Sequence, residues 1–349
     1  MNFVTGATGL IGSHLVLRLV EEGLPVTALF RNEKGQSEVF ELFQFYGKEN
    51  LFSQIQWVKG DVEDADDMFD LTEGIDTVFH CAAIVSYHKK EASRMLEVNI
   101  NGTKNVVNAC IENDVKHLIH ISSISALGDS KGKVIDEETP RDFNDYHSNY
   151  SKGKYLSEQE VWRGIQEGLG ATILNPGVIF GPNNCTRSSG TMIARIEKGL
   201  PALPAGGSGI VSVLDVVEVM VLAAKQAPRN ERYILCAENV RMSELFTKIA
   251  NALHVKIGKS IAKKWQIVLV YYMEALVELF TGKRATITRE IIRNYDEVKQ
   301  FDGSKATRVF GFQYRNTFSS IEDTVHYYRI LSKGASQVDL AKKKPLQQR

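Results

Sequence analysis

Three tyrosines stand close together in the stretch D-Y-H-S-N-Y-S-K-G-K-Y-L-S-E. A tyrosine can exchange a proton with a substrate near neutral pH when a neighbouring ammonium group favours its phenolate form. On a helix, a lysine four residues further along lies on the same face as the tyrosine. Tyr150 has Lys154 at this position, whereas Tyr146 has Tyr150 and Tyr155 has Gln159. The spacing therefore selects Tyr150 as the candidate acid–base residue.

The Tyr-x-x-x-Lys pattern occurs a second time, as Y-D-E-V-K from Tyr295 to Lys299. Nothing around this second copy suggests a site. Upstream of Tyr150, in contrast, the apolar run His117–Ile121 is followed by S-S-I-S-A-L-G. Serines at the carboxyl end of a parallel strand lie where open α/β sheets bind ligands. A serine there can hold a substrate carbonyl or hydroxyl beside Tyr150.

A glycine-rich segment opens the chain. The sequence T-G-A-T-G-L-I-G-S-H-L spaces Gly6, Gly9 and Gly12 as GxxGxxG, between an apolar run and a helical pattern. Gly6 permits a tight turn, Gly9 lets the backbone approach a pyrophosphate, and Gly12 lets the helix pack close to the sheet. The segment predicts a dinucleotide site with its phosphates at the N-terminus of a helix.

The end of the second apolar run bears on which dinucleotide binds. NAD-specific sites place Asp or Glu there to bind the ribose 2′-hydroxyl, but this chain has Phe30 followed by Arg31. Arginine suits a 2′-phosphate through charge-assisted bonds, and Lys34 can assist it. These residues favour NADP(H); if Arg31 is only a solvated surface charge, NAD(H) remains open. Asp61 can accept from the adenine amino group, and Val62 can flank the ring.

Short apolar runs alternate with longer amphipathic segments over the first half of the chain. The runs are typical of buried parallel strands: Asn2–Val4, Pro25–Phe30, Ile55–Val58, Thr77–His80, His117–Ile121 and Ala171–Leu174. Helical spacing marks the segments Leu10–Glu22, Arg94–Asn113 and Ser148–Glu167. This alternation predicts an α/β fold with a doubly wound parallel (Rossmann) sheet.

Glycine and proline punctuate the chain after Pro176, and the remaining helical patterns are shorter: Thr191–Lys198, Asp215–Lys225, Ser243–Ala252 and Phe318–Leu331. We expect an NAD(P)-binding domain over residues 1–175. A smaller, mostly helical substrate-binding lobe is expected over 176–332, with strands returning to the main sheet. Residues 333–349 lack apolar periodicity and are expected to be a disordered tail.

One segment of the smaller lobe is unusually apolar. It runs from Lys263 to Phe280 as K-K-W-Q-I-V-L-V-Y-Y-M-E-A-L-V-E-L-F, interrupted by Glu274 and Glu278. Its apolar part, from Trp265 onwards, is shorter than the roughly 20 residues that a membrane-spanning helix needs. A packed helix is the plainest interpretation. A substrate lid, or a helix at a membrane surface with a Lys–Trp rim, are the alternatives.

The composition excludes several classes of function. The formal net charge of the 349 residues is +0, so no basic field exists to attract nucleic acid. The four cysteines are far apart, and no His, Cys or carboxylate cluster has the spacing of a metal site. Buried thiols and the lack of a signal peptide before the glycine segment predict a cytoplasmic protein with a small-molecule substrate. Packing or hydrogen bonding, rather than catalysis, is expected of His80 and His120.

Several motifs together resemble the extended short-chain dehydrogenase/reductases of the NAD-dependent epimerase/dehydratase superfamily. They are TGxxGxxG, Asp61, H-C-A-A, N-I-N-G-T-K-N, the paired serines, YxxxK and N-P-G-V-I-F-G-P. The resemblance covers residues 1–330 and is most specific over residues 1–182.

The resemblance implies a role for each motif residue. Ser123 would polarise the substrate oxygen and Tyr150 would be the general acid/base. Lys154 would bind the nicotinamide ribose and lower the pKa of the tyrosine, and Asn99 would belong to the supporting network. Ser122 and Ser125 would be bystanders. The residues implied in cofactor binding are Gly6, Thr8, Gly9, Leu10, Ile11, Gly12, Arg31, Asp61, Val62, Ala82, Ala83, Tyr150, Lys154, Pro176, Gly177 and Val178.

The sugar-nucleotide branches of this family differ from the chain. Sugar dehydratases resemble S-T-D-E-V-Y-G after the fifth strand, but here their acid pair would fall on Ile124 and Ser125, which are not acidic. Epimerases usually have V-Y-G where this chain has A-L-G. They also tend to carry an arginine for the diphosphate, and none occurs in G-G-S-G-I-V-S-V-L-D.

The remaining features resemble the dihydroflavonol-reductase-like and 3β-hydroxysteroid-dehydrogenase-like branch. They are Arg31, S-S-I-S-A-L-G, G-V-I-F-G-P and the apolar segment Lys263–Phe280. This branch implies an NAD(P)H-dependent oxidoreductase that interconverts a carbonyl and a secondary alcohol, on a hydrophobic, non-nucleotide substrate.

Two other functions stay open. One is a nucleotide-sugar epimerase with tightly bound NAD. The other is an NADP(H)-binding redox sensor, although such sensors commonly lose the tyrosine or lysine that this chain keeps. The family resemblance also makes a homodimer plausible, with helices Arg94–Asn113 and Ser148–Glu167 of two chains forming a four-helix bundle.

Overall fold

The structure is a computed structural model of the chain. It describes residues 1–86, 88–129, 132–141, 148–183, 189–227, 229–281, 287, 292–293 and 295–332. The predicted disordered tail, residues 333–349, and Tyr146 lie outside the described residues.

A seven-stranded sheet forms the centre of the molecule, in the order β3-β2-β1-β4-β5-β6-β9. Every neighbouring pair in it is parallel. Its strands are β1 Asn2–Thr5, β2 Val26–Phe30, β3 Gln56–Lys59, β4 Thr77–His80, β5 His117–Ile121, β6 Ala171–Pro176 and β9 Glu231–Leu235. Successive strands are added on one side of β1 up to β3 and on the other side from β4 onwards. Such sheets bind ligands at this point, between β1 and β4. The predicted doubly wound sheet is therefore confirmed.

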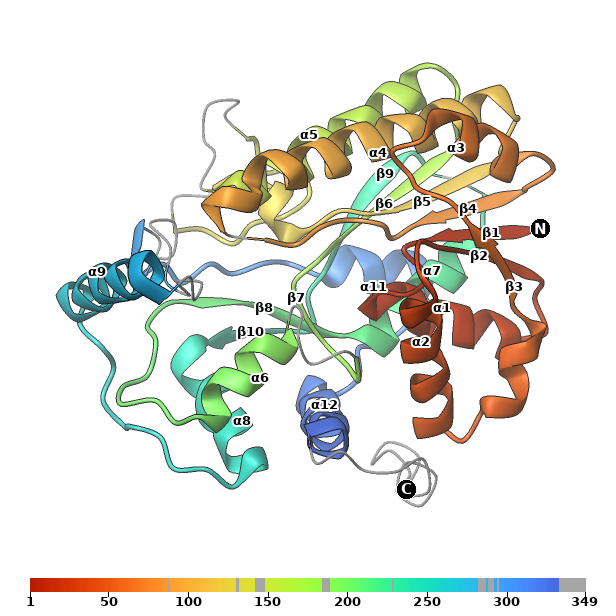
Figure 1. The fold of residues 1–349 in the computed structure, drawn as a ribbon. Helices are drawn as coiled ribbons and strands as arrows, with labels where there is room; N and C mark the ends of the chain where they lie inside the picture. Colours follow the sequence, from red (N-terminus) through yellow and green to blue (C-terminus); the bar gives the residue numbers. More distant parts are fainter. Residues whose placement is uncertain are drawn as a thin grey trace.

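Helices cover both faces of this sheet (Figure 1). One face carries α3 Ala65–Thr72, α4 Ala92–Glu112 and α5 Asn149–Gln166, and the other carries α1 Leu10–Glu21, α2 Glu33–Phe45, α7 Val213–Ala224 and α11 Ser304–Phe310. Alternate strand residues face opposite layers: Phe3 packs with Val106 and Val161, whereas Val4 packs with Leu15 and Val216. Both layers are apolar because the sheet is buried on both faces.

A smaller lobe follows β6 and is built around its own core, which includes Phe180, Ile210 and Val325. Its helices are α6 Ser189–Glu197, α8 Met242–Leu253, α9 Lys264–Thr281 and α12 Thr317–Ser332. It also holds a three-stranded sheet of β7 Val178–Phe180, β8 Gly207–Ser212 and β10 Glu238–Arg241, which the sequence did not predict. Strand β9 returns from this part of the chain to the main sheet, as expected.

No helix of the described residues is both long enough and apolar enough to cross a membrane.

Candidate active site

The glycine segment forms the tight turn between β1 and α1 that its spacing predicts. Gly6 has a φ of +64°, and a Cβ there would lie 2.6 Å from the backbone nitrogen of Ala82. A Cβ on Gly12 would lie 2.2 Å from the carbonyl oxygen of Gly6. Gly9 caps α1 in an extended conformation, so the first N–H groups of the helix point out of the turn. This cradle fits a dinucleotide pyrophosphate, because only glycine keeps the backbone this close.

The structure brings Arg31 and Asp61 together at the carboxyl ends of β2 and β3. Phe30 and Lys59 are partners in the sheet register, and each of the two predicted residues follows its strand closely. The Nη1 atom of Arg31 lies 3.8 Å from the Oδ2 atom of Asp61, and both side chains are exposed. The guanidinium is thus held loosely by Asp61 and keeps donors available for an anionic ligand.

Three other predicted cofactor residues already have neighbours in the protein. The Thr8 side chain lies against Gly35, where a Cβ would come within 2.8 Å of it. Ala82 donates its N–H to the hydroxyl of Thr5 over 3.3 Å. Val62 is buried and packs against Gly102 of α4, so its contact with an adenine ring stays a prediction.

Tyr150 lies in the first turn of α5, where the structure brings it to Ser123 at the end of β5. Ser148 caps the helix by accepting from the N–H of Ser151 over 2.8 Å. Ser123 begins a short 3₁₀ turn, Ile124–Ala126, and its hydroxyl is hydrogen-bonded to Tyr150. Both side chains are buried. The predicted pair therefore meets in a site shielded from water.

Burial raises the pKa of Tyr150, and the hydrogen bond with Ser123 offsets only part of that rise. Burial disfavours the charged phenolate, so the pKa lies above its usual value here. The lowering by Lys154 that the resemblance implied stays a prediction. Burial also lowers the pKa of Lys154, to about 8. The Nζ atom of Lys154 donates to the carbonyl oxygen of Ile121 over 2.9 Å, which fixes the ammonium at the end of β5.

Asn99 of α4 connects two parts of the site through its side chain and its backbone. Its Oδ1 atom accepts from the N–H of Ile84 over 2.7 Å, and its Nδ2 atom donates to the carbonyl of Ile84 over 3.0 Å. The hydroxyl of Ser157 on α5 donates to the Asn99 carbonyl over 2.7 Å. Asn99 thus ties the loop after β4 to the helix that carries Tyr150; its role in catalysis stays a prediction.

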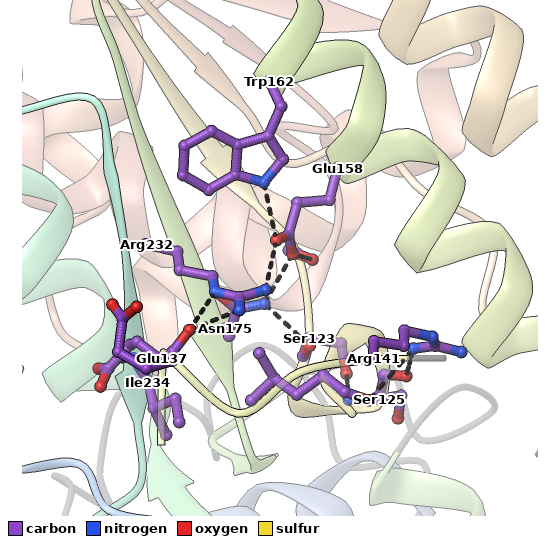
Figure 2. Close-up of polar contacts among 12 residues, drawn as sticks. Ser123, Ser125, Glu137, Arg141, Glu158, Trp162, Asn175, Arg232 and Ile234 are labelled. Carbon is purple, nitrogen blue, oxygen red and sulfur yellow. Dashed lines mark hydrogen bonds and ion pairs between the residues drawn. The ribbon is translucent and has the colours of Figure 1, made fainter. Parts of the chain in front are cut away.

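The sequence analysis missed a buried carboxylate, that of Glu158 on α5, which Figure 2 shows with its polar partners. Glu158 is 1% exposed. Its Oε2 atom accepts from the hydroxyl of Ser122 over 2.6 Å and from Nδ2 of Asn175 over 2.8 Å. Its Oε1 atom accepts from Nε1 of Trp162 over 3.2 Å and from Nη1 of Arg232 over 3.3 Å. Four donors therefore stabilise the buried charge.

The same network holds the backbone of Ser123. Asn175 donates from Nδ2 to the carbonyl of Ser123 over 3.1 Å, while it also binds Glu158. Arg232 lies on β9 and donates from Nε to the carbonyl of Glu137 over 2.8 Å, which extends the network from β9 to Glu137 (Figure 2). Ser122, expected to be a bystander, is a member of this network. The signal was present in the sequence, since Tyr150, Lys154 and Glu158 recur every four residues on one helix face.

The third tyrosine of the opening stretch has a packing role. The guanidinium of Arg141 lies over the ring of Tyr155, 4.7 Å from its centroid. Arg141 also donates to the carbonyl of Ser125 over 3.0 Å and to the hydroxyl of Ser151 over 2.7 Å. These contacts hold the turn after Ser123 against the start of α5.

The two histidines near the strand ends are buried and stacked, with ring centroids 5.2 Å apart. His80 is hydrogen-bonded to the hydroxyls of Thr5 and Thr103 over 2.8 Å and 3.0 Å. Burial lowers the pKa of His80 to about 3, and that of His120 falls well below its usual value. Both rings are therefore neutral at pH 7. Within the described residues, no group of three His, Cys, Asp or Glu side chains could hold a metal ion.

The glycine cradle lies where the strand order reverses, between β1 and β4, and a buried Tyr–Ser pair lies two strands away. This combination defines the class of dinucleotide-dependent enzymes. The model of the NAD dependent epimerase/dehydratase family matches residues 2–236. The chain belongs to this family, as the resemblance implied, and is an NAD(P)-dependent oxidoreductase.

Curated relatives match almost the whole chain. A Synechocystis protein provisionally named a dihydroflavonol 4-reductase is 26% identical over 334 residues, covering 94% of each chain. Sterol demethylase protein B of Methylococcus capsulatus is 27% identical over 330 residues, covering 93% of this chain and 97% of its own. The crystal structure of gox2253 has a TM-score of 0.79 at 28% identity, covering 95% of this chain and 99% of that one.

Proposed function

We propose that the protein is an NADP(H)-dependent reductase that converts a carbonyl group into a secondary alcohol on an apolar, non-nucleotide substrate. The observation that carries the proposal is the hydrogen bond between Tyr150 and Ser123, buried at the end of β5 with the Lys154 ammonium nearby. A buried phenol with a raised pKa stays protonated at pH 7, which is the state that a proton donor needs.

Each side chain has one task in this reaction. Ser123 donates a hydrogen bond to the substrate oxygen and stabilises the charge that develops there. Tyr150 gives its proton to the same oxygen, and the Lys154 ammonium stabilises the phenolate that remains. Bound NADPH supplies the hydride that reaches the carbonyl carbon. In the reverse direction Tyr150 takes the proton from the alcohol.

The cofactor is held along the carboxyl ends of the strands. Gly6, Gly9 and Gly12 receive the pyrophosphate, and Arg31 binds the 2′-phosphate while Asp61 accepts from the adenine amino group. Lys154 binds the nicotinamide ribose. The implied contacts of Leu10, Ile11, Ala83 and Pro176–Val178 complete the site.

The names of two relatives support an apolar substrate. Besides the sterol demethylase protein, a farnesyl-dihydroquinoline-oxide ketoreductase of Stigmatella aurantiaca is 28% identical over 237 residues, 67% of each chain. Ketoreduction of an isoprenoid-bearing or ring ketone needs no diphosphate-binding arginine, in agreement with the arginine-free stretch that forms β8.

The nucleotide released from freshly purified, denatured protein tests the proposal first, by mass spectrometry. We expect little bound nucleotide, tighter uptake of NADPH than of NADH, and net NADPH consumption with apolar ketones or aldehydes. Near-stoichiometric NAD(H) without net consumption would instead identify an epimerase that keeps its cofactor.

Arg31→Ala tests the choice of cofactor within the same assay. We expect the Kd for NADPH to rise by about tenfold to a hundredfold, because a phosphate loses a charge-assisted partner, while the Kd for NADH changes little. Lys116→Ala is the matched control, since Lys116 is an exposed cation just before β5, at the opposite end of the sheet from Arg31. Equal effects of Arg31→Ala on both nucleotides would contradict a 2′-phosphate contact.

A further inference from the structure

Helix α9 turns an apolar face outwards. Trp265, Leu269, Tyr272 and Leu276 follow each other at helical spacing and are 62%, 54%, 63% and 58% exposed. The same face is widened by Met273, Val277 and Phe280, of which Phe280 is 78% exposed. Large apolar side chains gathered on one exposed face mark a contact surface rather than ordinary protein surface.

The opposite side of α9 carries its carboxylates and attaches it to the protein. Glu278 accepts from the ammonium of Lys90 over 2.9 Å and lies 3.4 Å from the ring of His88. Glu274 accepts from the N–H of Ile287 over 2.8 Å and lies 3.8 Å from the guanidinium of Arg195. These polar contacts reverse the usual arrangement of a surface helix, in which the apolar side faces inwards. They define which face points away from the protein.

Charge next to this face indicates what covers it. Four exposed lysines lie just before α9 or at its first residue: Lys256, Lys259, Lys263 and Lys264. No acidic residue occurs in the sequence between Lys256 and Glu274. The ammonium of Lys264 lies 3.9 Å from the carboxylate of Asp296. Exposed lysines beside an apolar face with Trp265 and Tyr272 match a bilayer surface, where phosphates meet acyl chains.

We propose that α9 docks the protein reversibly on an anionic lipid surface, with the outward apolar face in the interface and the four lysines on the head groups. The contacts of Glu278 and Glu274 place α9 between the loop that follows β4 and helix α6 of the smaller lobe (Figure 1). The lipid surface then lies next to the carboxyl end of the sheet, where Ser123 follows β5 and meets Tyr150 of α5. An apolar substrate reaches the enzyme from the bilayer, a consequence that rests on the proposed reductase function.

Flotation of the full-length protein with vesicles tests the docking without any turnover. We expect flotation with vesicles of phosphatidylglycerol and phosphatidylcholine in equal parts, and much less with phosphatidylcholine alone. Leu269→Glu/Leu276→Glu should abolish it by placing charge in the interface. Phe69→Glu on α3 is the matched control, because Phe69 is 45% exposed on the main domain, and it should float like the wild type.

The lysines are tested by a second variant. Lys259→Gln/Lys263→Gln/Lys264→Gln should weaken binding to the anionic vesicles by roughly a hundredfold, with the apolar face intact. Tyr150→Phe should bind vesicles like the wild type, so that failure of the reductase proposal is distinguishable from failure of the docking.

Two outcomes overturn the proposal. One is a failed flotation test: the wild-type protein does not float with the anionic vesicles, or the variant Leu269→Glu/Leu276→Glu floats as well as the wild type. The other is a dimer in light scattering that Leu276→Glu converts to a monomer, since a second copy of the chain would then cover the face. The homodimer expected from the family resemblance uses α4 and α5 instead and should survive Leu276→Glu.

Discussion

The chain contains the Tyr-x-x-x-Lys spacing twice, and the two copies end in different environments. Tyr150 and Lys154 lie one turn apart on α5. Tyr295 lies in a turn, and its hydroxyl donates to the carbonyl of Ala262 over 3.0 Å. Both tyrosines are buried, at 8% and 5% exposed, so burial does not separate them. The difference lies in the partner of each hydroxyl.

A tyrosine works as an acid only if its proton can leave for a substrate. Tyr150 is hydrogen-bonded to the side chain of Ser123, which can turn towards a ligand. The hydroxyl of Tyr295 is instead bound to backbone, since it donates to the carbonyl of Ala262. The lysines differ too, because Lys154 is fully buried and donates to β5, whereas Lys299 is 3.4 Å from the carboxylate of Glu297. The Tyr-x-x-x-Lys spacing alone does not define a site. The copy at Tyr150 differs because its helix, α5, faces the end of β5 and Ser123.

The largest expected difference between the two copies is in turnover. Tyr150→Phe removes the proton donor and should lower kcat by about a thousandfold, within the usual range for general acid catalysis. Tyr295→Phe removes one structural hydrogen bond, so kcat should stay within a factor of about two while the free energy of unfolding falls by about 1 kcal/mol. Steady-state NADPH consumption and urea unfolding measure both. Full activity of Tyr150→Phe would sink the assignment.

The buried network gives a smaller effect on turnover and a larger one on stability. Glu158→Gln removes the negative charge that pairs with Arg232. The new amide NH2 group would also face other hydrogen-bond donors. The free energy of unfolding should therefore fall by about 3 kcal/mol. Turnover should fall about tenfold, because Asn175 no longer holds the Ser123 carbonyl in place.

Glu160→Gln on the same helix is the matched control for this network. Glu160 pairs with Arg163 near the surface, so its loss should cost at most about 0.5 kcal/mol and leave turnover unchanged. If the two variants behave alike in urea unfolding, the network does not support the site.

The pH dependence of the reduction gives a graded change, which is small near neutral pH. The pKa of Lys154 is lowered to about 8, so its ammonium is present below that pH and is lost above it. We expect kcat/KM to fall as pH rises through about 8, by about tenfold per unit above it. Tyr150, whose pKa is raised, stays protonated over this range and does not cause the fall.

Lys154→Arg and Lys299→Arg separate the two copies in the same pH series. A guanidinium stays charged, so the profile of Lys154→Arg should become flat, although at a lower rate. Lys299→Arg should keep the wild-type profile, since Lys299 contacts the carboxylates of Glu297 and Asp129 and not β5. An unchanged fall in Lys154→Arg would assign the titration to another group.

Local sequence patterns predicted much of the main domain. Thr77–His80 and His117–Ile121 are strands with the predicted bounds, and α1 ends at Glu21, one residue before the predicted end. Buried strands and long amphipathic helices were recognisable because the residues that decide them are neighbours in the chain. Helix α2 was missed, and its Phe40 and Phe43 pack against Phe52 of the following 3₁₀ turn, a contact that only the folded chain shows. The sheet of the smaller lobe was missed because its strands pair across long stretches of chain.

The sequence by itself determined the glycine turn, the family, and the shared helix face of Tyr150 and Lys154, because each depends on residues close together in the chain. The sequence already favoured the copy at Tyr150, but only the tertiary structure decided that Tyr150 meets Ser123 and that Glu158 gathers Ser122, Asn175 and Arg232. It also decided that burial raises the pKa of Tyr150 and that α9 presents its apolar side outwards. Desolvation and long-range pairing arise from segments that meet only in the folded chain, so no local pattern could contain them.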